Sequence, residues 1–339
     1  MKKVLALFIL LSICLLNSCS NKTTYNSKYT DKNLKSEREI IIPAKEVKKL
    51  IENESVLIAE VSWGDEKDSK EYLKNHIKNA IHINTDMIEE GPVWNLIEDK
   101  KLIENVKNLG IDIDTKVILY GEDPEPPARV CWALKYLGVK NVKILDGGLQ
   151  AWKKENFPLE KGSVKVKPIS VFKAHKPLNP QFNMSIDQVV QKLENDKDFK
   201  LVSVRSKQEW LGKESGYTYI PKAGEVKGAI WGKGGSDAYT SEDYLNEDGT
   251  YKSWQDIQKM YEKLGFKADN NTAYYCGTGW RAAIPWIRAY ENGIDSMVFD
   301  GGWNEWQMHD ELFAQVGDPK SDDFKIIKVK DLPKNKASK

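Results

Sequence analysis

Short apolar runs alternate along the chain with longer stretches in which apolar residues recur at helical spacing. Six runs are suited to buried parallel strands: Ser55–Val61, Lys116–Tyr120, Val142–Leu145, Phe199–Val204, Thr272–Tyr275 and Met297–Phe299. Lys100–Leu109 and Ser253–Leu264 are two of the helical stretches between them. This alternation predicts an α/β fold with central parallel sheets and helices on both faces.

The same order of elements occurs twice. In the first half, a strand, a loop, a helix and a second strand lead to Asp146-Gly147-Gly148 and Trp152. In the second half, the same order leads to Asp300-Gly301-Gly302 and Trp306. Further aromatic residues fall at matching offsets from the two glycine pairs, namely Trp132 and Tyr136 in the first half and Trp286 and Tyr290 in the second. The repeat predicts two tandem domains that arose by duplication.

Changes in composition suggest where the domains begin and end. We predict a lipoprotein signal peptide (1–18), a flexible tether (19–37), an N-terminal domain (38–155), a linker (156–183), a C-terminal domain (184–312) and a charged, solvated tail (313–339).

The N-terminus is typical of an export signal. Lys2-Lys3 precede an apolar run, Val4–Leu16, that is too short to remain as a membrane-spanning helix. Leu16-Asn17-Ser18-Cys19 resembles a bacterial lipobox, whose cysteine is lipidated. We therefore expect an exported protein that is anchored to the extracytoplasmic face of a bacterial membrane through Cys19 only. The alternative is an ordinary secreted protein that is cleaved nearby.

The composition of the chain limits the partners and reactive residues that we expect. The 339-residue chain carries a net charge of +1 with acids and bases interspersed, which gives no indication of a nucleic acid partner. The four histidines form no ligand spacing, and we expect neither a metal ion nor another cofactor. Cys131 falls in an apolar helical pattern and is expected in the core. Cys276 is therefore the candidate reactive cysteine of the two domains.

Cys276 opens a short loop between a strand and a helix. Gly277 and Gly279 allow backbone N–H groups to converge on one point, and the positive end of the next helix favours an anion there. Arg281 adds a formal charge. Pro285 is expected in the first turn of the helix, where proline is tolerated. The segment predicts a nucleophilic thiolate, and the alternative is a buried structural cysteine.

Together these features resemble the tandem rhodaneses, which are thiosulfate or 3-mercaptopyruvate sulfurtransferases. The likeness covers roughly residues 38–312. It rests on the duplicated glycine pairs, the loop Cys276–Arg281, the segment Leu201–Trp210 that opens the second half, and the stretch Asp248–Ser253.

The resemblance implies a small-molecule sulfurtransferase with its site at the base of a cleft between the halves. Cys276 would carry a persulfide, with thiosulfate as the expected donor, mercaptopyruvate as the second choice, and cyanide or a thiol as the acceptor. The residues expected to bind the donor are Arg205, Gly277, Thr278, Gly279, Trp280 and Arg281. Ser203 and Glu225 depart from the family pattern, and Gln208-Glu209 stand where mercaptopyruvate enzymes have a second arginine.

The first half lacks this chemistry. Its equivalent loop, Gly121–Pro127, has no cysteine, and its three carboxylates would repel an anion. We expect this half to be structural, with Trp63 and Trp94 as possible cleft residues for which packing in the core is the more usual role.

Two other functions stay open. A cysteine-dependent phosphatase or arsenate reductase is disfavoured because those enzymes use a loop one residue longer than Cys276–Arg281. A non-catalytic sulfur-binding or interaction module would require an unreactive Cys276.

Overall fold

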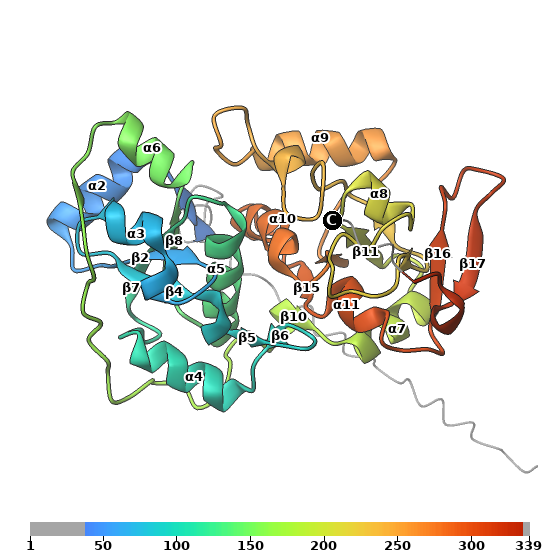
Figure 1. Ribbon diagram of the computed structural model, residues 1–339, viewed down its shortest axis with the longest axis horizontal. Helices are drawn as coiled ribbons and strands as arrows, with labels where there is room; N and C mark the ends of the chain where they lie inside the picture. The colour runs from blue at the N-terminus through green and yellow to red at the C-terminus, as the bar shows by residue number, and fades with distance from the viewer. Residues whose placement is uncertain (1–37, 335–339) are drawn as a thin grey trace, which may run out of the picture.

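Residues 38–334 are described by a computed structural model, in which each half of the chain is built on a five-stranded sheet (Figure 1). The first sheet has the order β1-β8-β7-β2-β4, with β1 Ile41–Ile42, β2 Leu57–Ser62, β4 Ile81–Asn84, β7 Lys116–Tyr120 and β8 Asn141–Leu145. The second has the matching order β10-β15-β14-β11-β13, with β10 Asn183–Met184, β11 Lys200–Ser203, β13 Ile230–Trp231, β14 Thr272–Tyr275 and β15 Met297–Phe299. Every neighbouring pair in both sheets is parallel, which confirms the predicted duplication.

Helices cover both faces of each sheet (Figure 1). In the first half they are α2 Ala44–Asn53, α3 Lys70–Lys74, α4 Asp99–Asn108, α5 Glu125–Leu137 and α6 Gly148–Lys154. In the second half they are α7 Ile186–Asn195, α8 Lys207–Trp210, α9 Trp254–Leu264, α10 Trp280–Glu291 and α11 Gly302–Trp306. The buried strands carry apolar residues on both sides, so α4 and α5 pack on one face of the first sheet and α2 and α6 on the other. The predicted α/β architecture is confirmed.

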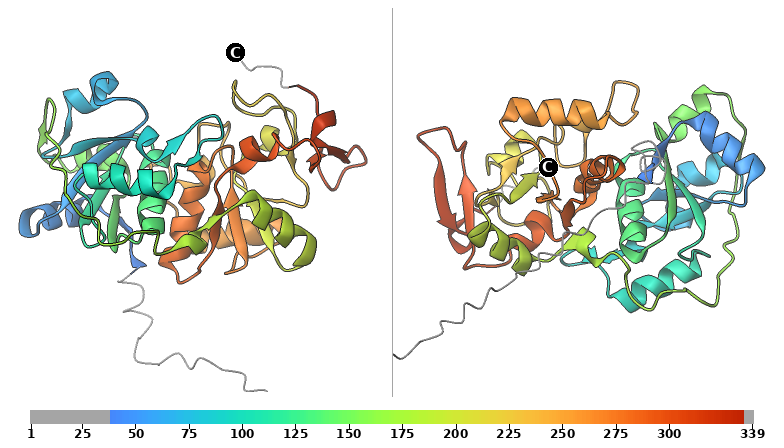
Figure 2. Two further views of the ribbon diagram at one scale, coloured as in Figure 1. Left: turned by 90° about the horizontal axis from the view of Figure 1, so that it is seen from below. Right: turned by 180° about the vertical axis from the view of Figure 1, so that it is seen from behind.

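The two halves share one core. Helices α5 and α10, which occupy equivalent places in the repeat, lie side by side in all three views (Figures 1 and 2). The apolar cluster around them runs from the first sheet to the second without a break. Each half also supports the repeated aspartate of the other, because Asp300 accepts a hydrogen bond from the Leu96 amide at 2.7 Å and Asp146 accepts one from the Tyr251 amide at 2.8 Å. The packing therefore fixes the walls of any site between the halves.

Short strands complete the fold. They are β3 His76–Ile77, β5 Glu89–Glu90, β6 Asn95–Leu96, β9 Leu159–Glu160, β12 Glu225–Val226, β16 Phe313–Val316 and β17 Lys325–Lys328. The predicted linker contains β9, which pairs with β3, and it later buries Phe172 and Phe182 in the core that the two halves share. It therefore packs along the first half over part of its length.

The predicted solvated tail is wrong for residues 313–334. Strands β16 and β17 form an antiparallel hairpin, and β12 extends it to a three-stranded sheet. Val329 is 0% exposed, and it packs with Ala314 and Leu332 in the core of the second half. The many lysines obscured this pattern, because only a few of the apolar residues in this segment point inward, and Phe313 and Ile326 are exposed.

We expect deletion of residues 313–339 to lower the free energy of unfolding by several kcal/mol, because burial of one Val or Leu side chain is worth about 1.5–3 kcal/mol. Urea unfolding followed by circular dichroism measures the change. Ile326→Ser is the matched control, since this hairpin residue is half-exposed and its replacement should have little effect. An unchanged midpoint for the deletion would restore the solvated-tail prediction.

The export signal, Cys19 and the tether 19–37 lie outside the described residues. Within residues 38–334, the helices are all too short or too polar to cross a lipid bilayer.

Candidate active site

Cys276 follows β14 at the carboxyl end of the second parallel sheet, where α/β proteins place their ligands. Its carbonyl accepts a hydrogen bond from the Trp303 amide at 2.9 Å, just after the repeated glycine pair. The first half repeats this contact, with the Leu149 amide donating to the Gly121 carbonyl at 3.1 Å. Gly121 therefore occupies in the first half the place that Cys276 has in the second.

The loop after Cys276 is shaped by two glycines. Gly279 has φ +85°, and a Cβ there would lie 2.6 Å from Nη1 of Arg129. A Cβ on Gly277 would lie 2.3 Å from the ring of Tyr217. In the described chain, the amides of Gly277, Thr278 and Gly279 donate no hydrogen bond to another protein atom. These amides are free to bind an anion, as the sequence predicts.

Helix α10 begins directly at Trp280, so its positive end lies at this loop. The prediction that Pro285 lies in the first turn is wrong, because Pro285 is inside the helix. Proline has no amide hydrogen, so the helix loses one internal bond there. Gly279, which precedes α10, therefore marks where the helix begins, and Pro285 does not.

Arg281 reaches the site with most of its donors already used. Its two Nη atoms each lie 2.9 Å from a carboxylate oxygen of Glu209, and Nη2 also donates to the hydroxyl of Tyr217 at 3.4 Å. Its Nε is buried and has no hydrogen-bond partner within residues 38–334. One N–H of the guanidinium is therefore available to a small anion.

Glu209 joins the two predicted arginines. Its Oε1 accepts a hydrogen bond from Nε of Arg205 at 3.2 Å, and it also binds Arg281. Burial alone disfavours the charged carboxylate, but the guanidinium groups of Arg281 and Arg205 hold its pKa at about 2. Glu209 therefore stays ionised between them.

Arg205 is fully buried behind Glu209 and does not line the cavity. Its Nη1 donates to the Gly224 carbonyl at 2.7 Å and to Glu225 at 3.2 Å. The structure thus brings Arg281 to the site and places Arg205 one layer further in.

Ser203 and Glu225, the two departures from the family pattern, contact each other. The Ser203 hydroxyl donates to Glu225 at 2.8 Å, and the hydroxyl of Tyr275 donates to the same carboxylate. Burial raises the pKa of Glu225, while Arg205 opposes that rise. Glu225 therefore supplies the buried carboxylate beside Arg205 in place of an acid at position 203.

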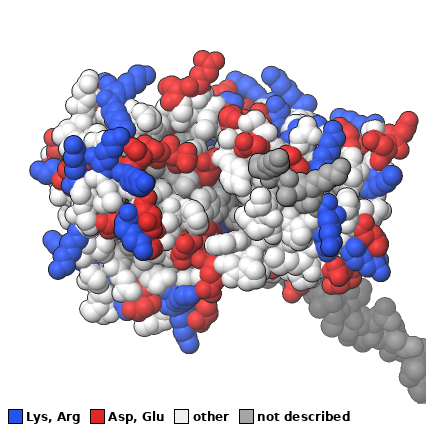
Figure 3. Space-filling model, viewed as in Figure 1, with Lys and Arg blue, Asp and Glu red and all other residues white. Residues whose placement is uncertain are grey.

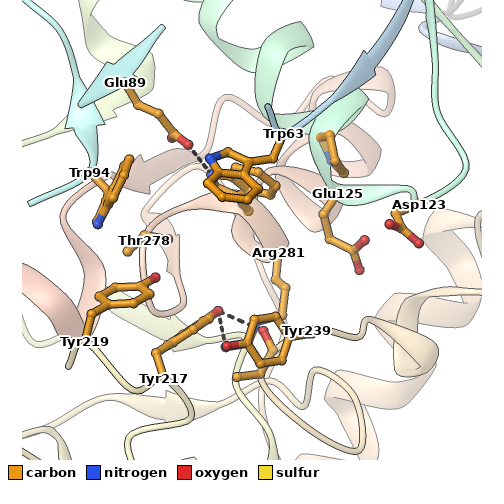
Figure 4. Close-up of a pocket in the computed structure, with 13 residues that line it drawn as sticks. Trp63, Glu89, Trp94, Asp123, Glu125, Tyr217, Tyr219, Tyr239, Thr278 and Arg281 are labelled. Atoms are coloured by element: carbon orange, nitrogen blue, oxygen red, sulfur yellow. Dashed lines mark hydrogen bonds between the residues drawn. The ribbon is translucent and has the colours of Figure 1, made fainter. Parts of the chain in front are cut away.

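A cavity of about 490 Å³ lies between the two halves above the loop. It is lined by Trp63, Glu89, Trp94, Asp123, Glu125, Pro126, Tyr217, Tyr219, Ala238, Tyr239, Thr278, Trp280 and Arg281. Acidic side chains border the hollow between the halves on the face shown in Figure 3, and Figure 4 shows the lining residues. Cys276 is 1% exposed and is not among the residues that line this cavity.

The expectation that Trp63 and Trp94 pack in the core is wrong. Both line the cavity, and Trp63 is 67% exposed. Trp94 adopts φ +67°, an uncommon conformation for a bulky residue, and its ring lies 6.3 Å from that of Tyr219 in the other half. Aromatic rings from both halves therefore meet over the site.

Glu89 connects the first half to the catalytic loop. It accepts a hydrogen bond from Nε1 of Trp280 at 2.7 Å (Figure 4). It also accepts one from Nε of Arg129 at 3.0 Å. Arg129 also forms an ion pair with Asp300 at 2.6 Å. Burial raises the pKa of Glu89 to about 7, although Arg129 and Trp280 oppose the rise. The first half thus supplies a carboxylate to the site and is more than a structural wall.

The sequence analysis did not identify several residues of this site. Glu209 lay in the segment Leu201–Trp210 but was given no role of its own. Glu89, Tyr217, Tyr219 and Tyr239 carried no motif, although the aromatic residues at 217 and 219 were a visible signal. No group of three or more His, Cys, Asp or Glu residues within 38–334 is arranged to hold a metal ion.

Comparison with known proteins gives consistent matches. The family model for the rhodanese-like domain matches residues 43–155 and 185–309. Thiosulfate sulfurtransferase YnjE of Escherichia coli (strain K12) is 41% identical over 251 residues, which cover 74% of this chain and 57% of YnjE. The match therefore spans little more than half the length of that relative. Sulfur carrier protein TtuD of Thermus thermophilus is 29% identical over 79% of this chain and 93% of TtuD.

Comparison with solved structures also gives matches to proteins of this kind. The crystal structure of YnjE superposes with a TM-score of 0.77 and 36% identity, covering 82% of this chain and 68% of that chain. A structure of an EanB variant in complex with ergothioneine superposes with a TM-score of 0.79 and 30% identity, covering 87% of this chain and 74% of that chain.

Proposed function

Because the chain belongs to the rhodanese family, with a rhodanese-like domain in each half, we propose that it carries a sulfane sulfur as a persulfide on Cys276 and transfers it to a thiophilic acceptor. One observation carries this proposal. Cys276 lies at the carboxyl end of β14 beneath unpaired loop amides, the start of α10 and the free Nε of Arg281. That arrangement stabilises a terminal sulfur anion.

The first step is attack of the Cys276 thiolate on the outer sulfur of thiosulfate. The bond between the two sulfurs of thiosulfate breaks, its electron pair leaves with sulfite, and a persulfide anion remains on Cys276. The Nε of Arg281 and the loop amides are placed to bind the anionic donor and then the terminal sulfur. We propose that Arg205 acts at a distance, by fixing Glu209 and through it Arg281.

The second step regenerates the thiolate of Cys276 and passes the sulfur to the acceptor. A thiolate or cyanide attacks the terminal sulfur, the persulfide bond breaks, and its electron pair stays on Sγ of Cys276. The names of YnjE and TtuD support a sulfur-transfer or sulfur-carrier role. The similarity to EanB with bound ergothioneine supports an organic acceptor over cyanide alone.

One observation favours a second function, a non-catalytic module that binds sulfur. Cys276 is 1% exposed, so a donor reaches it only if the loop or the rings above it move. A phosphatase or arsenate reductase stays the weaker alternative because of its longer loop.

The test is the intact mass of the chain of residues 20–339, which keeps every described residue, before and after reaction with thiosulfate or mercaptopyruvate. We expect thiosulfate to add one sulfur, about 32 Da, and cyanide to remove it. Sulfur from mercaptopyruvate alone would reassign the donor. No added sulfur with either donor would favour the binding module.

We also propose export and lipid anchoring through Cys19, which only the lipobox-like segment Leu16–Cys19 supports.

A further inference from the structure

The cavity above Cys276 has aromatic walls from both halves. Trp63 and Trp94 come from the first half, and Tyr217, Tyr219 and Tyr239 come from the second (Figure 4). Tyr219 is 48% exposed and Tyr239 is 68% exposed, so these rings are only partly covered by other protein atoms. Large exposed rings that gather on one cavity mark a binding surface.

The charged side chains on the cavity wall are mostly of the acidic type. Asp123 and Glu125 form no ion pair within residues 38–334, and in Figure 4 they lie on the side opposite Trp94 and Tyr219. Glu89 and Asp300 share the single charge of Arg129. Arg281 is the only basic residue among those that line the cavity, and Glu209 neutralises it.

The volume limits the size of a ligand. A cavity of about 490 Å³ is in the range that holds small organic molecules, and it is far larger than thiosulfate needs. The donor therefore leaves most of the space unfilled. A group that occupies the rest must suit aromatic faces and carboxylates together, and an alkylated ammonium does so through cation–π contacts and charge.

We infer that the sulfur acceptor is a small organic thiol that carries an alkylated ammonium group, held by the rings and carboxylates of this cavity. The inference rests on the proposed function and names its acceptor class. The acceptor thiolate attacks the terminal sulfur of the Cys276 persulfide, and a new sulfur–sulfur bond forms on the acceptor. The persulfide bond breaks and its electron pair stays on Cys276, so no other oxidant or reductant is needed.

The test loads the chain of residues 20–339 with thiosulfate and measures the rate at which thiols discharge it, by intact mass. Thiocholine is the cationic probe, and its analogue with carbon in place of the nitrogen is the neutral one. Discharge of glutathione persulfide in solution corrects for their different nucleophilicity. We expect thiocholine to be faster by about tenfold after correction, as one cation–π contact of ordinary strength allows.

Two substitutions test whether the preference for thiocholine arises in this cavity. Glu125→Gln and Trp63→Ala should each remove most of the preference for thiocholine over the neutral thiol. Glu122→Gln is the matched control, since this exposed carboxylate is on the same loop but does not line the cavity. Equal corrected rates for both thiols in the loaded protein would overturn the inference and leave the proposed function standing.

A second measurement does not depend on the persulfide. Tetramethylammonium should change the tryptophan fluorescence of the unloaded protein in a saturable way, tert-butanol should not, and Trp63→Ala should weaken the effect. If the protein fails to load with sulfur, the proposed function fails, but saturable binding of tetramethylammonium would still support a cation site. The absence of that binding would overturn the inference independently.

Discussion

Replacing Cys276 with serine should leave the protein unable to take up sulfur from thiosulfate. Serine has nearly the same shape, but its hydroxyl does not ionise near neutral pH and forms no stable bond to sulfane sulfur. We expect the transfer rate to fall by roughly three orders of magnitude or more, as for other nucleophile replacements. Intact mass after thiosulfate and a sulfite-release assay both measure the loss.

Cys131 provides the matched control. It is the other cysteine of the described residues, and it is fully buried in α5. Burial raises the pKa of its thiol to about 12, so it stays protonated. Cys131→Ser should therefore take up one sulfur as the parent protein does. Uptake by Cys276→Ser, or loss of uptake in Cys131→Ser with an unchanged fold, would contradict the assignment of the nucleophile.

The buried scaffold could be predicted from the sequence because its signal is local. Strands β7, β14 and β15 have the predicted ends, since each is built around a short apolar run. The glycine pairs revealed the repeat because backbone contacts in both halves require them at the same place. The hairpin β16–β17 was not predicted because its few inward residues are spaced among lysines.

The loop and its nucleophile could also be predicted, but the wall of the site could not. Glu89 and Trp63 line the cavity because the two halves pack together, which brings together residues far apart in the chain. The sequence analysis named both Arg205 and Arg281 as residues that bind the donor, whereas the fold separates them by Glu209. Charge pairing of this kind depends on three-dimensional distances, for which a single sequence has no signal.

Glu209→Ala should be the most destabilising single substitution near the site. It removes the partner shared by Arg205 and Arg281 and leaves two buried guanidinium groups without it. Breaking a buried ion pair by removing one partner costs about 3–5 kcal/mol. Urea unfolding at neutral pH measures the loss. Glu262→Ala is the matched control, because the pair of Glu262 with Lys267 is exposed and surface pairs are worth about 0–1 kcal/mol.

The pH dependence separates this charge effect from a loss of packing. The pKa of Glu209 is about 2 in the folded protein and 4.5 in the unfolded chain, so its stabilisation is fully present above about 4.5 and is lost as pH falls towards 2. The difference in unfolding free energy between the parent protein and Glu209→Ala should therefore shrink across that range. A difference that stays constant with pH would mean that Glu209 stabilises the fold by packing alone. In that case, the alignment of Arg281 with the sulfur site would need another cause.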